Sequence, residues 1–261
     1  GDSMEAIGPV AGDNGWFQLY APNDKVIMQD LLSRARNNGF STLVVTADVP
    51  GPSRREDMAR AGAPIGSRNA MSLTPRVFWQ SMTHPTWALA ALQNGGKFRF
   101  KNLEPYYDAS SFDNVTQFIG SQLNGSLDWD YLNEIRAAWD GPLILKGILN
   151  GQDATRAVAA GVDGLIVSNH GGRQLDAVPA SIDLLEAIRS SVGPKVPLLF
   201  DSGVRSGLDI ARALAAGADF VMCGRAFMYG VAALGEPGPD HVLAVLKDEL
   251  ENTMVQLGLE R

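Results

Sequence analysis

The stretch from 164 to 173 reads Gly164-Leu165-Ile166-Val167-Ser168-Asn169-His170-Gly171-Gly172-Arg173. Its first four residues are apolar and predict a short buried strand that stops at Ser168. The two glycines permit a tight turn and the close approach of a ligand, while the planar guanidinium of Arg173 suits a carboxylate or a phosphate. We therefore expect His170 to serve as a base and Arg173 to hold an anionic substrate, although a solvated strand end would have the same composition.

A unit made of a helix end, a glycine and a short apolar strand recurs along the chain. Its glycines are Gly39, Gly161 and Gly217, which can close helices in the left-handed conformation. The last two copies also share an aspartate, at Asp163 and Asp219. Helices that alternate with continuously apolar strands predict a parallel sheet covered on both faces. We expect strands at 16–20, 42–46, 143–146, 164–167, 197–200 and 220–224.

The predicted strands end in polar or charged residues. Functional groups gathered at the C-terminal ends of parallel strands are typical of the catalytic face of an α/β fold of the (β/α)8 TIM barrel type, and a doubly wound sheet gathers them likewise. No Gly-x-Gly-x-x-Gly motif follows the first strand, which disfavours a dinucleotide-binding fold. A closed barrel has eight strands, and the sequence predicts six. We therefore expect one barrel domain over 1–261 whose first two strands are missing from this chain.

The composition is that of an ordinary globular protein, with 45% hydrophobic and 20% charged residues in a chain of 261. A net charge of -7 argues against a nucleic-acid partner. The single cysteine, Cys223, excludes an internal disulfide and fits a reducing compartment. Without an apolar run of about 18 residues or a signal peptide at the start, the sequence predicts a cytoplasmic protein with no spanning helix. No motif predicts a bound metal.

A long excursion separates the second predicted strand from the third. Residues 54–101 carry eight basic residues against two acidic ones, a net charge of +6 in a chain whose total is -7. Apolar side chains are interleaved with them: Phe78, Trp79, Met82, Trp87 and Leu89. Basic and aromatic residues together suit an anionic membrane surface, but a lid or a subunit contact would bury the same side chains. The excursion reaches about residue 110, and amphipathic helices are predicted at 112–123 and 128–139.

The last two predicted strands lead into loops that contain glycine and arginine. Gly203 and Arg205 follow one strand, and Gly224 and Arg225 end the other. Barrels commonly bind a phosphate with the loops after these strands, because glycines expose backbone N–H groups and arginines supply charge. A helix that begins near 206–209 would add its positive dipole end. The sequence therefore predicts a phosphate site at this edge of the barrel.

Two charged residues at strand ends have more than one possible role. Asp201 ends the strand that follows the one leading to His170, and a carboxylate beside an imidazole favours the imidazolium. We expect Asp201 to pair with His170, unless it caps its own loop. Lys146 ends an apolar strand, where a charge is costly unless it is paired. It either forms a Schiff base, as in aldolase-type barrels, or stabilises negative charge on a reduced ring system.

Several motifs, spread over essentially the whole chain, match one known family. They are Trp16-Phe17-Gln18-Leu19-Tyr20, Thr46-Ala47-Asp48, Arg54-Arg55-Glu56-Asp57, Leu145-Lys146-Gly147, the stretch from Ser168 to Asp176, Asp201-Ser202-Gly203-Val204-Arg205 and Gly224-Arg225. With these motifs the chain resembles the FMN-dependent L-2-hydroxy-acid dehydrogenases and oxidases, such as glycolate oxidase, L-lactate dehydrogenase and mandelate dehydrogenase. Thr83-His84-Pro85-Thr86-Trp87 is most similar to the membrane-associated lactate and mandelate dehydrogenases.

The resemblance implies FMN as the cofactor and a role for each matched residue. The flavin contacts would come from Gln18, Thr46, Lys146, Ser168 and Asp201, and the phosphate contacts from Gly203, Arg205, Gly224 and Arg225. His170 would be the catalytic base with Asp201 as its partner, and Lys146 would lie at the N1/C2 edge of the flavin. Arg173, Arg55 and Tyr20 would form the substrate site. The first two barrel strands and a further active-site tyrosine would precede Gly1.

The residues and the resemblance together predict the oxidation of an L-2-hydroxy acid, of the lactate or mandelate type, to the 2-keto acid. Electrons would pass from FMN to a quinone, or to oxygen if the protein is an oxidase. By resemblance the enzyme would be a homotetramer, and it would lie peripherally on the inner face of the plasma membrane. Two alternatives come from other classes: a phosphate-binding TIM-barrel lyase that uses Lys146, and an inactive truncated fragment that binds a partner.

Overall fold

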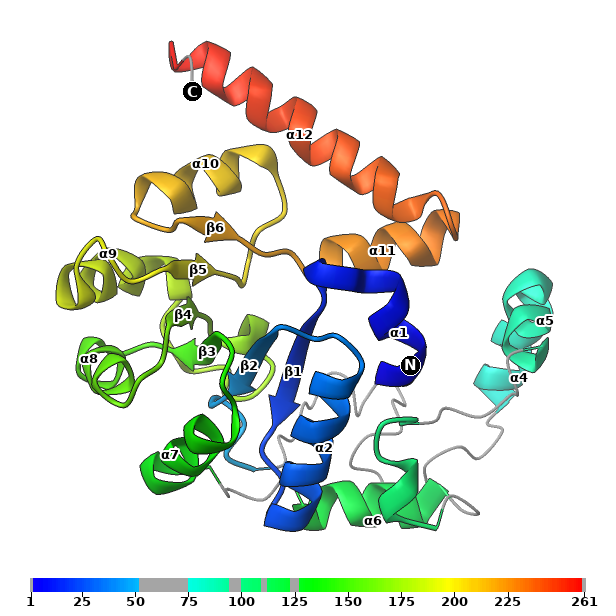
Figure 1. The fold of residues 1–261 in the computed structure, drawn as a ribbon. Helices are drawn as coiled ribbons and strands as arrows, with labels where there is room; N and C mark the ends of the chain where they lie inside the picture. The colour runs from blue at the N-terminus through cyan, green and yellow to red at the C-terminus, as the bar shows by residue number, and fades with distance from the viewer. Residues whose placement is uncertain (1, 52–74, 94–99, 109–111, 123–126, 260–261) are drawn as a thin grey trace.

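A computed structural model of the chain describes residues 2–51, 75–93, 100–108, 112–122 and 127–259 (Figure 1). Six strands form one sheet in the order β1-β2-β3-β4-β5-β6, and every neighbouring pair is parallel. They are β1 (Trp16–Tyr20), β2 (Thr42–Thr46), β3 (Leu143–Ile148), β4 (Gly164–Val167), β5 (Leu198–Phe200) and β6 (Phe220–Val221). All six predicted strands are confirmed, and so is the α/β barrel fold class.

Eleven helices are described, and most of them lie around the outside of the sheet (Figure 1). They are α1 (Met4–Ala11), α2 (Lys25–Asn37), α4 (Pro75–Thr83), α5 (Pro85–Gln93), α6 (Phe112–Gln122), α7 (Trp129–Ala138), α8 (Gly151–Ala159), α9 (Ser181–Val192), α10 (Gly207–Ala215), α11 (Arg225–Leu234) and α12 (Gly238–Gln256). The predicted helices at 112–123 and 128–139 correspond to α6 and α7. Side chains cap the start of several helices that return from the strand ends: Asp24 for α2, Asp128 for α7, Asn150 for α8 and Ser206 for α10.

The sheet separates two layers of apolar side chains, because successive residues of a strand point to opposite faces. One face contributes residues such as Leu43, Leu145 and Leu165 to the large core shared with the helices. The opposite face holds a small buried cluster made of Val44, Ile144, Ile166 and Leu199. Two positions further along the chain, the same four segments carry Thr46, Lys146, Ser168 and Asp201. The alternation therefore places a polar layer directly beyond the small apolar cluster.

The aspartate shared by two copies of the repeated unit ties the opposite, N-terminal ends of the strands together. Asp163 Oδ2 accepts hydrogen bonds from the Leu143 N–H at 2.8 Å and from Arg136 at 2.9 Å. Asp219 Oδ2 accepts the equivalent bonds from the Leu198 N–H at 2.8 Å and from Arg189 at 2.6 Å. Each aspartate thus joins the start of one strand to the preceding helix. These contacts lie far from the polar layer and stabilise the fold.

β1 and β6 are the two edge strands of the described sheet. The apolar edge residues Trp16 and Phe220 are 43% and 61% exposed, whereas Leu43, Leu143, Leu165 and Leu198 on the inner strands are fully buried. β6 ends at Val221, earlier than predicted, although the Met222 N–H still donates to the Phe200 carbonyl at 2.8 Å. The described chain therefore provides six parallel strands of the barrel with both edges open.

The return arm of the excursion after β2 packs along α2. Arg34, near the end of α2, donates to the Asn102 carbonyl at 2.9 Å and to the Tyr106 hydroxyl at 3.0 Å. At the other end of α2, the Asn23 N–H donates to the Gln122 carbonyl at 2.8 Å. Segments 100–106 and 112–122 are thus tied to the barrel, whereas α4 and α5 project away from the strands (Figure 1).

Replacing Asp219 by alanine should lower the free energy of unfolding by roughly 1–3 kcal/mol, because the buried Leu198 N–H and Arg189 lose their acceptor. Burial opposes ionisation of this carboxyl, but the bonds from Leu198 and Arg189 outweigh it and hold the pKa of Asp219 below its ordinary value. The stabilisation is therefore present at neutral pH and is lost as acid protonates the carboxylate. Urea unfolding at neutral and acidic pH measures both effects, with Asp248→Ala on exposed α12 as the control. Equal stability of the two variants at neutral pH would contradict the assignment.

Candidate active site

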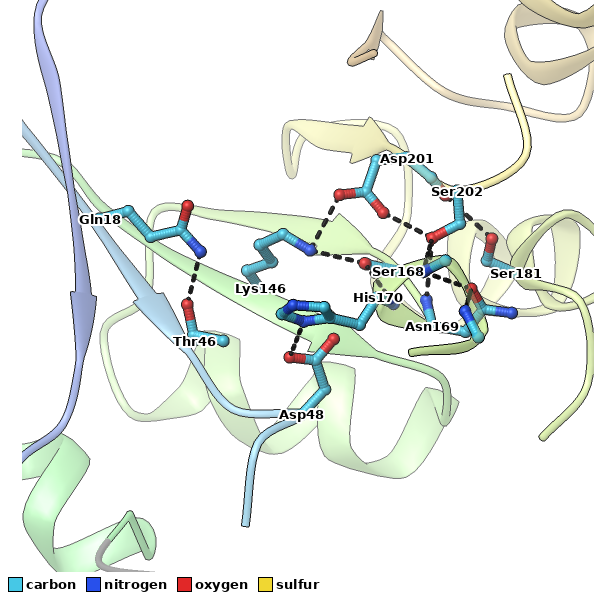
Figure 2. Close-up of polar contacts among 12 residues, drawn as sticks. Gln18, Thr46, Asp48, Lys146, Ser168, Asn169, His170, Ser181, Asp201 and Ser202 are labelled. Carbon is cyan, nitrogen blue, oxygen red and sulfur yellow. Dashed lines mark hydrogen bonds and ion pairs between the residues drawn. The ribbon is translucent and has the colours of Figure 1, made fainter. Parts of the chain in front are cut away.

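Polar side chains on or just after five neighbouring strands, β1 to β5, converge in one layer (Figure 2). The structure brings together six residues that the sequence predicted for the site: Gln18, Thr46, Lys146, Ser168, His170 and Asp201. Gln18 on β1 donates to the Thr46 hydroxyl of β2 at 2.7 Å. The layer therefore begins at the edge strand β1 and continues across the sheet to the residue that follows β5.

Lys146 is a buried cation in the middle of this layer, with 8% of the residue exposed. Its ammonium lies 2.8 Å from Asp201 Oδ2 and donates to the Ser168 hydroxyl at 2.6 Å. A buried ammonium is costly unless a partner neutralises it and accepts its hydrogen bonds. Asp201 supplies the negative charge, so Lys146 is held as a paired cation at the end of β3.

The carboxylate beside His170 is Asp48, and the expectation that Asp201 would fill this place is wrong. His170 Nδ1 lies 3.0 Å from Asp48 Oδ1, and the two side chains are about nine-tenths buried, with 10% and 11% exposed. A carboxylate accepts hydrogen bonds, so Nδ1 is the donor of this pair, and a neutral imidazole would have its lone pair on Nε2. Asp201 cannot take this role because its carboxylate binds Lys146 and the Ser202 hydroxyl.

A glycine on the intervening strand permits the contact between Asp48 and His170. Asp48 follows β2 and His170 follows β4, so β3 lies between them. Gly147 on β3 has φ +100°, and the register of β3 against β4 shifts between Lys146 and Ile148. A β-carbon on Gly147 would lie 2.5 Å from the Asp48 β-carbon. The absence of a side chain on β3 at this point therefore leaves the space that Asp48 occupies.

The turn after β4 holds His170 in an uncommon backbone conformation. His170 has φ +57°, and Gly171 and Gly172 follow with φ +68° and +72°. The Asn169 side chain accepts from the Gly171 N–H at 3.0 Å and from the Gly172 N–H at 3.2 Å. The two glycines predicted to bend the chain are thus needed for their positive φ angles, and the turn directs the imidazole toward Asp48 (Figure 2).

The structure describes two of the three residues that were expected to bind a substrate. The Tyr20 ring lies edge-on to the His170 ring, with centroids 6.4 Å apart. Arg173 is exposed and closes the short 3-10 helix η3 (His170–Gly172). Arg55 lies outside the described residues. The structure therefore places Tyr20 and Arg173 on the same side of the sheet as the imidazole.

A cavity of about 470 Å³ adjoins the histidine turn on the side of β5, and Gly171, Gly203 and Arg225 are among its lining residues. The Arg225 guanidinium donates to the Gly171 carbonyl at 3.2 Å. Gly224 precedes α11 without a side-chain cap, so the first N–H groups of this helix remain available to an anion. These features fit a phosphate group.

The helix predicted near 206–209 is α10, but its N-terminal N–H groups already have partners. Ser206 Oγ accepts from the Asp209 N–H at 3.2 Å, and the Glu249 carboxylate accepts from the Gly207 N–H at 2.8 Å. Arg205 is exposed, and its own N–H donates to Asp209 at 3.1 Å. Two of the first N–H groups of α10 therefore already have acceptors within the protein, whereas α11 begins without a side-chain cap.

Two residues at the site were not assigned a role from the sequence. Asp48 stands in a matched motif, but it lies far from His170 along the chain, so the motif alone does not predict their contact. The one sequence feature that bears on the contact is Gly147, which follows Lys146 on the strand between the two residues and has no side chain. Ser202 bonds to Asp201 at 2.8 Å and to the turn after β4. The sequence does not predict these contacts of Ser202, because a serine in a glycine-containing loop does not by itself indicate a partner.

A barrel with a buried lysine, a carboxylate-bound histidine and loops that fit a phosphate group is compatible with a flavin-dependent enzyme. The chain belongs to the FMN-dependent dehydrogenase family, which its sequence matches over residues 1–261. The expected family resemblance is thereby confirmed.

Two L-lactate dehydrogenases are similar to almost the whole chain. The chain is 41% identical over 256 residues to an L-lactate dehydrogenase of Pseudomonas entomophila (strain L48), covering 98% of this chain and 66% of the relative. It is 40% identical over 256 residues to an L-lactate dehydrogenase of Pseudomonas aeruginosa, with the same coverage of 98% and 66%. The chain thus spans about two thirds of the length of these relatives.

Solved structures agree with this placement. The crystal structure of the monotopic membrane protein (S)-mandelate dehydrogenase has a TM-score of 0.89 and 36% identity, covering 98% of this chain and 66% of that one. Mandelate oxidase has a TM-score of 0.75 and 33% identity, covering 99% and 64%. The similarity therefore extends over the whole described barrel.

Replacing Gly147 by alanine should lower the free energy of unfolding by about 2 kcal/mol or more, because the new β-carbon meets Asp48 and the φ of +100° disfavours alanine. Urea denaturation measures the effect. Gly120 on α6 is the matched control, since its β-carbon would enter open space. Gly120→Ala should be neutral or stabilising by up to about 1 kcal/mol. A Gly147→Ala variant as stable as the parent would contradict the close packing.

Proposed function

We propose that this chain, as one FMN-binding barrel unit over 1–261, carries out the oxidation of an L-2-hydroxy acid to the 2-keto acid. The observation that carries the proposal is the arrangement of two separate side-chain pairs in one layer, a lysine–carboxylate ion pair and a histidine hydrogen-bonded to a carboxylate. Lys146 with Asp201 and His170 with Asp48 provide a fixed cation and a hydrogen-bonded base on neighbouring strand ends. Family membership supports FMN as the cofactor, and the relatives named above support lactate or mandelate as the substrate type.

His170 is the proposed catalytic base. Its Nε2 takes a proton from the substrate, either from the α-carbon or from the hydroxyl group. The imidazolium that results is stabilised by Asp48 at 3.0 Å. Because the pair is largely buried, its electrostatic attraction is screened less than on the surface. Asp48 therefore replaces Asp201 as the proposed partner of the base.

Lys146 and its neighbours are the proposed flavin contacts, together with Gln18, Thr46, Ser168 and Asp201. FMN held there would supply two-electron redox chemistry, from the substrate to a second acceptor. Lys146 presents a buried positive charge to the ring, which favours negative charge at the facing edge. The proposed phosphate contacts are Gly203, Arg205, Gly224 and Arg225, and the N-terminus of α11 supports them.

Arg173, Arg55 and Tyr20 are the proposed substrate contacts. The arginines suit the carboxylate through paired N–H donors, and the Tyr20 ring lies beside the imidazole, with ring centroids 6.4 Å apart. We favour lactate, followed by mandelate and other larger acids. Comparing the kcat/KM values of glycolate, L-lactate and (S)-mandelate tests this order, and a much higher value for glycolate would overturn it.

The alternative of a lyase that forms a Schiff base is disfavoured. A lysine nucleophile must lose its proton, but Lys146 is paired with Asp201 at 2.8 Å and donates to Ser168 at 2.6 Å. Both contacts favour the ammonium form. The comparisons likewise support the oxidation of 2-hydroxy acids over the lyase.

Replacing His170 by alanine should lower kcat by roughly 10²–10⁴-fold, the usual contribution of a general base. Bound FMN should be retained, because the proposed phosphate contacts lie on other segments. Steady-state turnover and the visible flavin absorbance per protein measure the two quantities. His241→Ala, at an exposed position on α12, is the matched control. Near-normal turnover of the His170 variant would rule out this base.

A peripheral position on an anionic membrane is also proposed, with a quinone as the electron acceptor and oxygen as the alternative. The α4 and α5 helices carry exposed apolar side chains, with Trp79 69%, Trp87 57% and Leu92 71% exposed. The net charge of +6 over 54–101 adds attraction to anionic lipid. Within the described ranges, no helix is long and apolar enough to cross a membrane. The membrane would be the inner face of the plasma membrane.

Replacing both Trp79 and Trp87 by serine should weaken co-sedimentation with anionic phospholipid vesicles by about tenfold or more, because two inserted aromatic rings are lost. Binding should also fall at high salt. Val255→Ser serves as the control, since Val255 is 74% exposed on α12, away from the excursion. Equal vesicle binding by the parent, the double tryptophan variant and Val255→Ser would refute membrane contact through α4 and α5. It would favour the alternative that the excursion forms a lid.

The proposed assembly is a homo-oligomer, a tetramer by family resemblance. Exposed apolar side chains on α11 and α12 support a contact between copies: Met228 and Tyr229 are each 69% exposed, and Leu243 is 58% exposed. Light scattering after size-exclusion chromatography distinguishes this assembly from a monomer.

A further inference from the structure

Ser202 has a backbone conformation that a serine rarely adopts. Its φ is +85°, and His170 is the other non-glycine residue with positive φ in the part of the chain that the structure describes. For a residue with a β-carbon this backbone region is strained. Glycine would meet the backbone requirement without that strain. The side chain at this position must therefore be explained by its contacts.

The Ser202 hydroxyl uses all of its hydrogen-bonding capacity. It donates to Asp201 Oδ1 at 2.8 Å, and it accepts from the Gly171 N–H at 3.0 Å and from the Asn169 N–H at 3.3 Å. A hydroxyl group has one donor and two acceptor sites. The two N–H groups belong to the residues on either side of His170.

A second serine holds the N–H group of His170 itself. Ser168 Oγ accepts from the His170 N–H at 3.0 Å and from Lys146 Nζ at 2.6 Å. Two hydroxyl groups therefore bind three consecutive N–H groups of the turn, those of residues 169, 170 and 171. Because Lys146 also pairs with Asp201, these contacts form a closed ring that joins the lysine to the histidine turn (Figure 2).

We propose that Ser202 is a positioning residue, which fixes the histidine turn relative to the Lys146–Asp201 pair and thereby sets the imidazole for proton removal. The proposal rests on the proposed function of His170. Reaction rates depend steeply on such placement, and a shift of about 1 Å can cost on the order of 10²-fold. The Ser202 hydroxyl bonds directly to both the Asp201 carboxylate and the N–H groups of the turn, whereas the other link runs through Lys146 and Ser168.

Two variants distinguish the effect of the Ser202 hydroxyl from the effect of the backbone strain at this residue. Ser202→Gly removes the hydroxyl and also the strain, whereas Ser202→Ala removes the hydroxyl and keeps the β-carbon. If Ser202 positions His170, both variants should lower kcat by about 10–100-fold and leave KM within about threefold. The glycine variant should melt no lower than the alanine variant, because it relieves the φ of +85°. Ser190→Ala is the control, since the Ser190 hydroxyl bonds only within α9.

Amide hydrogen exchange of the FMN-free protein provides a readout that does not depend on turnover. The peptide containing 169–172 should exchange about tenfold faster or more in Ser202→Gly than in the parent and in Ser190→Ala. Parental exchange in this peptide, or faster exchange with parental kcat, would overturn the proposal. If the parent protein oxidises no 2-hydroxy acid while exchange in Ser202→Gly rises, the proposed function fails and the positioning of the turn stands.

Discussion

The buried ammonium of Lys146 is the constraint around which the polar end of this barrel is built. A cation on a strand with 8% exposure must have a counter-ion and acceptors within reach. Asp201 and Ser168 meet this requirement from the ends of β5 and β4. Since Asp201 is occupied by the lysine, the histidine takes its carboxylate from β2 instead. The positive charge of Lys146 on β3 thus determines which aspartate pairs with the lysine and which pairs with the histidine.

The result is two side-chain pairs with different chemical roles. The Lys146–Asp201 pair keeps a positive charge in place without offering a nucleophile. The His170–Asp48 pair leaves one imidazole nitrogen available as a base. Gly147 separates the two pairs along β3 and leaves room for Asp48. A cofactor that accepts electrons next to the lysine and a substrate that loses a proton to the histidine would then meet across this short stretch of the sheet.

The sequence predicted the parts of the structure that depend on local periodicity. All six parallel strands were predicted from short apolar runs, three of which follow glycines that can close a helix, and the polar layer follows from the alternation along each strand. The partner of His170 was predicted wrongly, because order along the chain makes Asp201 the nearer candidate. The competition for Asp201 by Lys146, and the passage of Asp48 over Gly147, depend on packing between strands that are far apart in sequence. Likewise, the bond that Glu249 of the distant α12 accepts from the Gly207 N–H at the start of α10 could not be predicted from local sequence.

The central claim is that this arrangement serves the oxidation of a 2-hydroxy acid by bound flavin. The most direct measurement is the visible absorbance of the FMN-loaded protein after anaerobic mixing with L-lactate or (S)-mandelate. The account predicts loss of the oxidised flavin absorbance with the L-isomer, together with formation of the 2-keto acid in a one-to-one ratio to flavin. A flavin-loaded protein whose spectrum stays unchanged with all 2-hydroxy acids tested would contradict it.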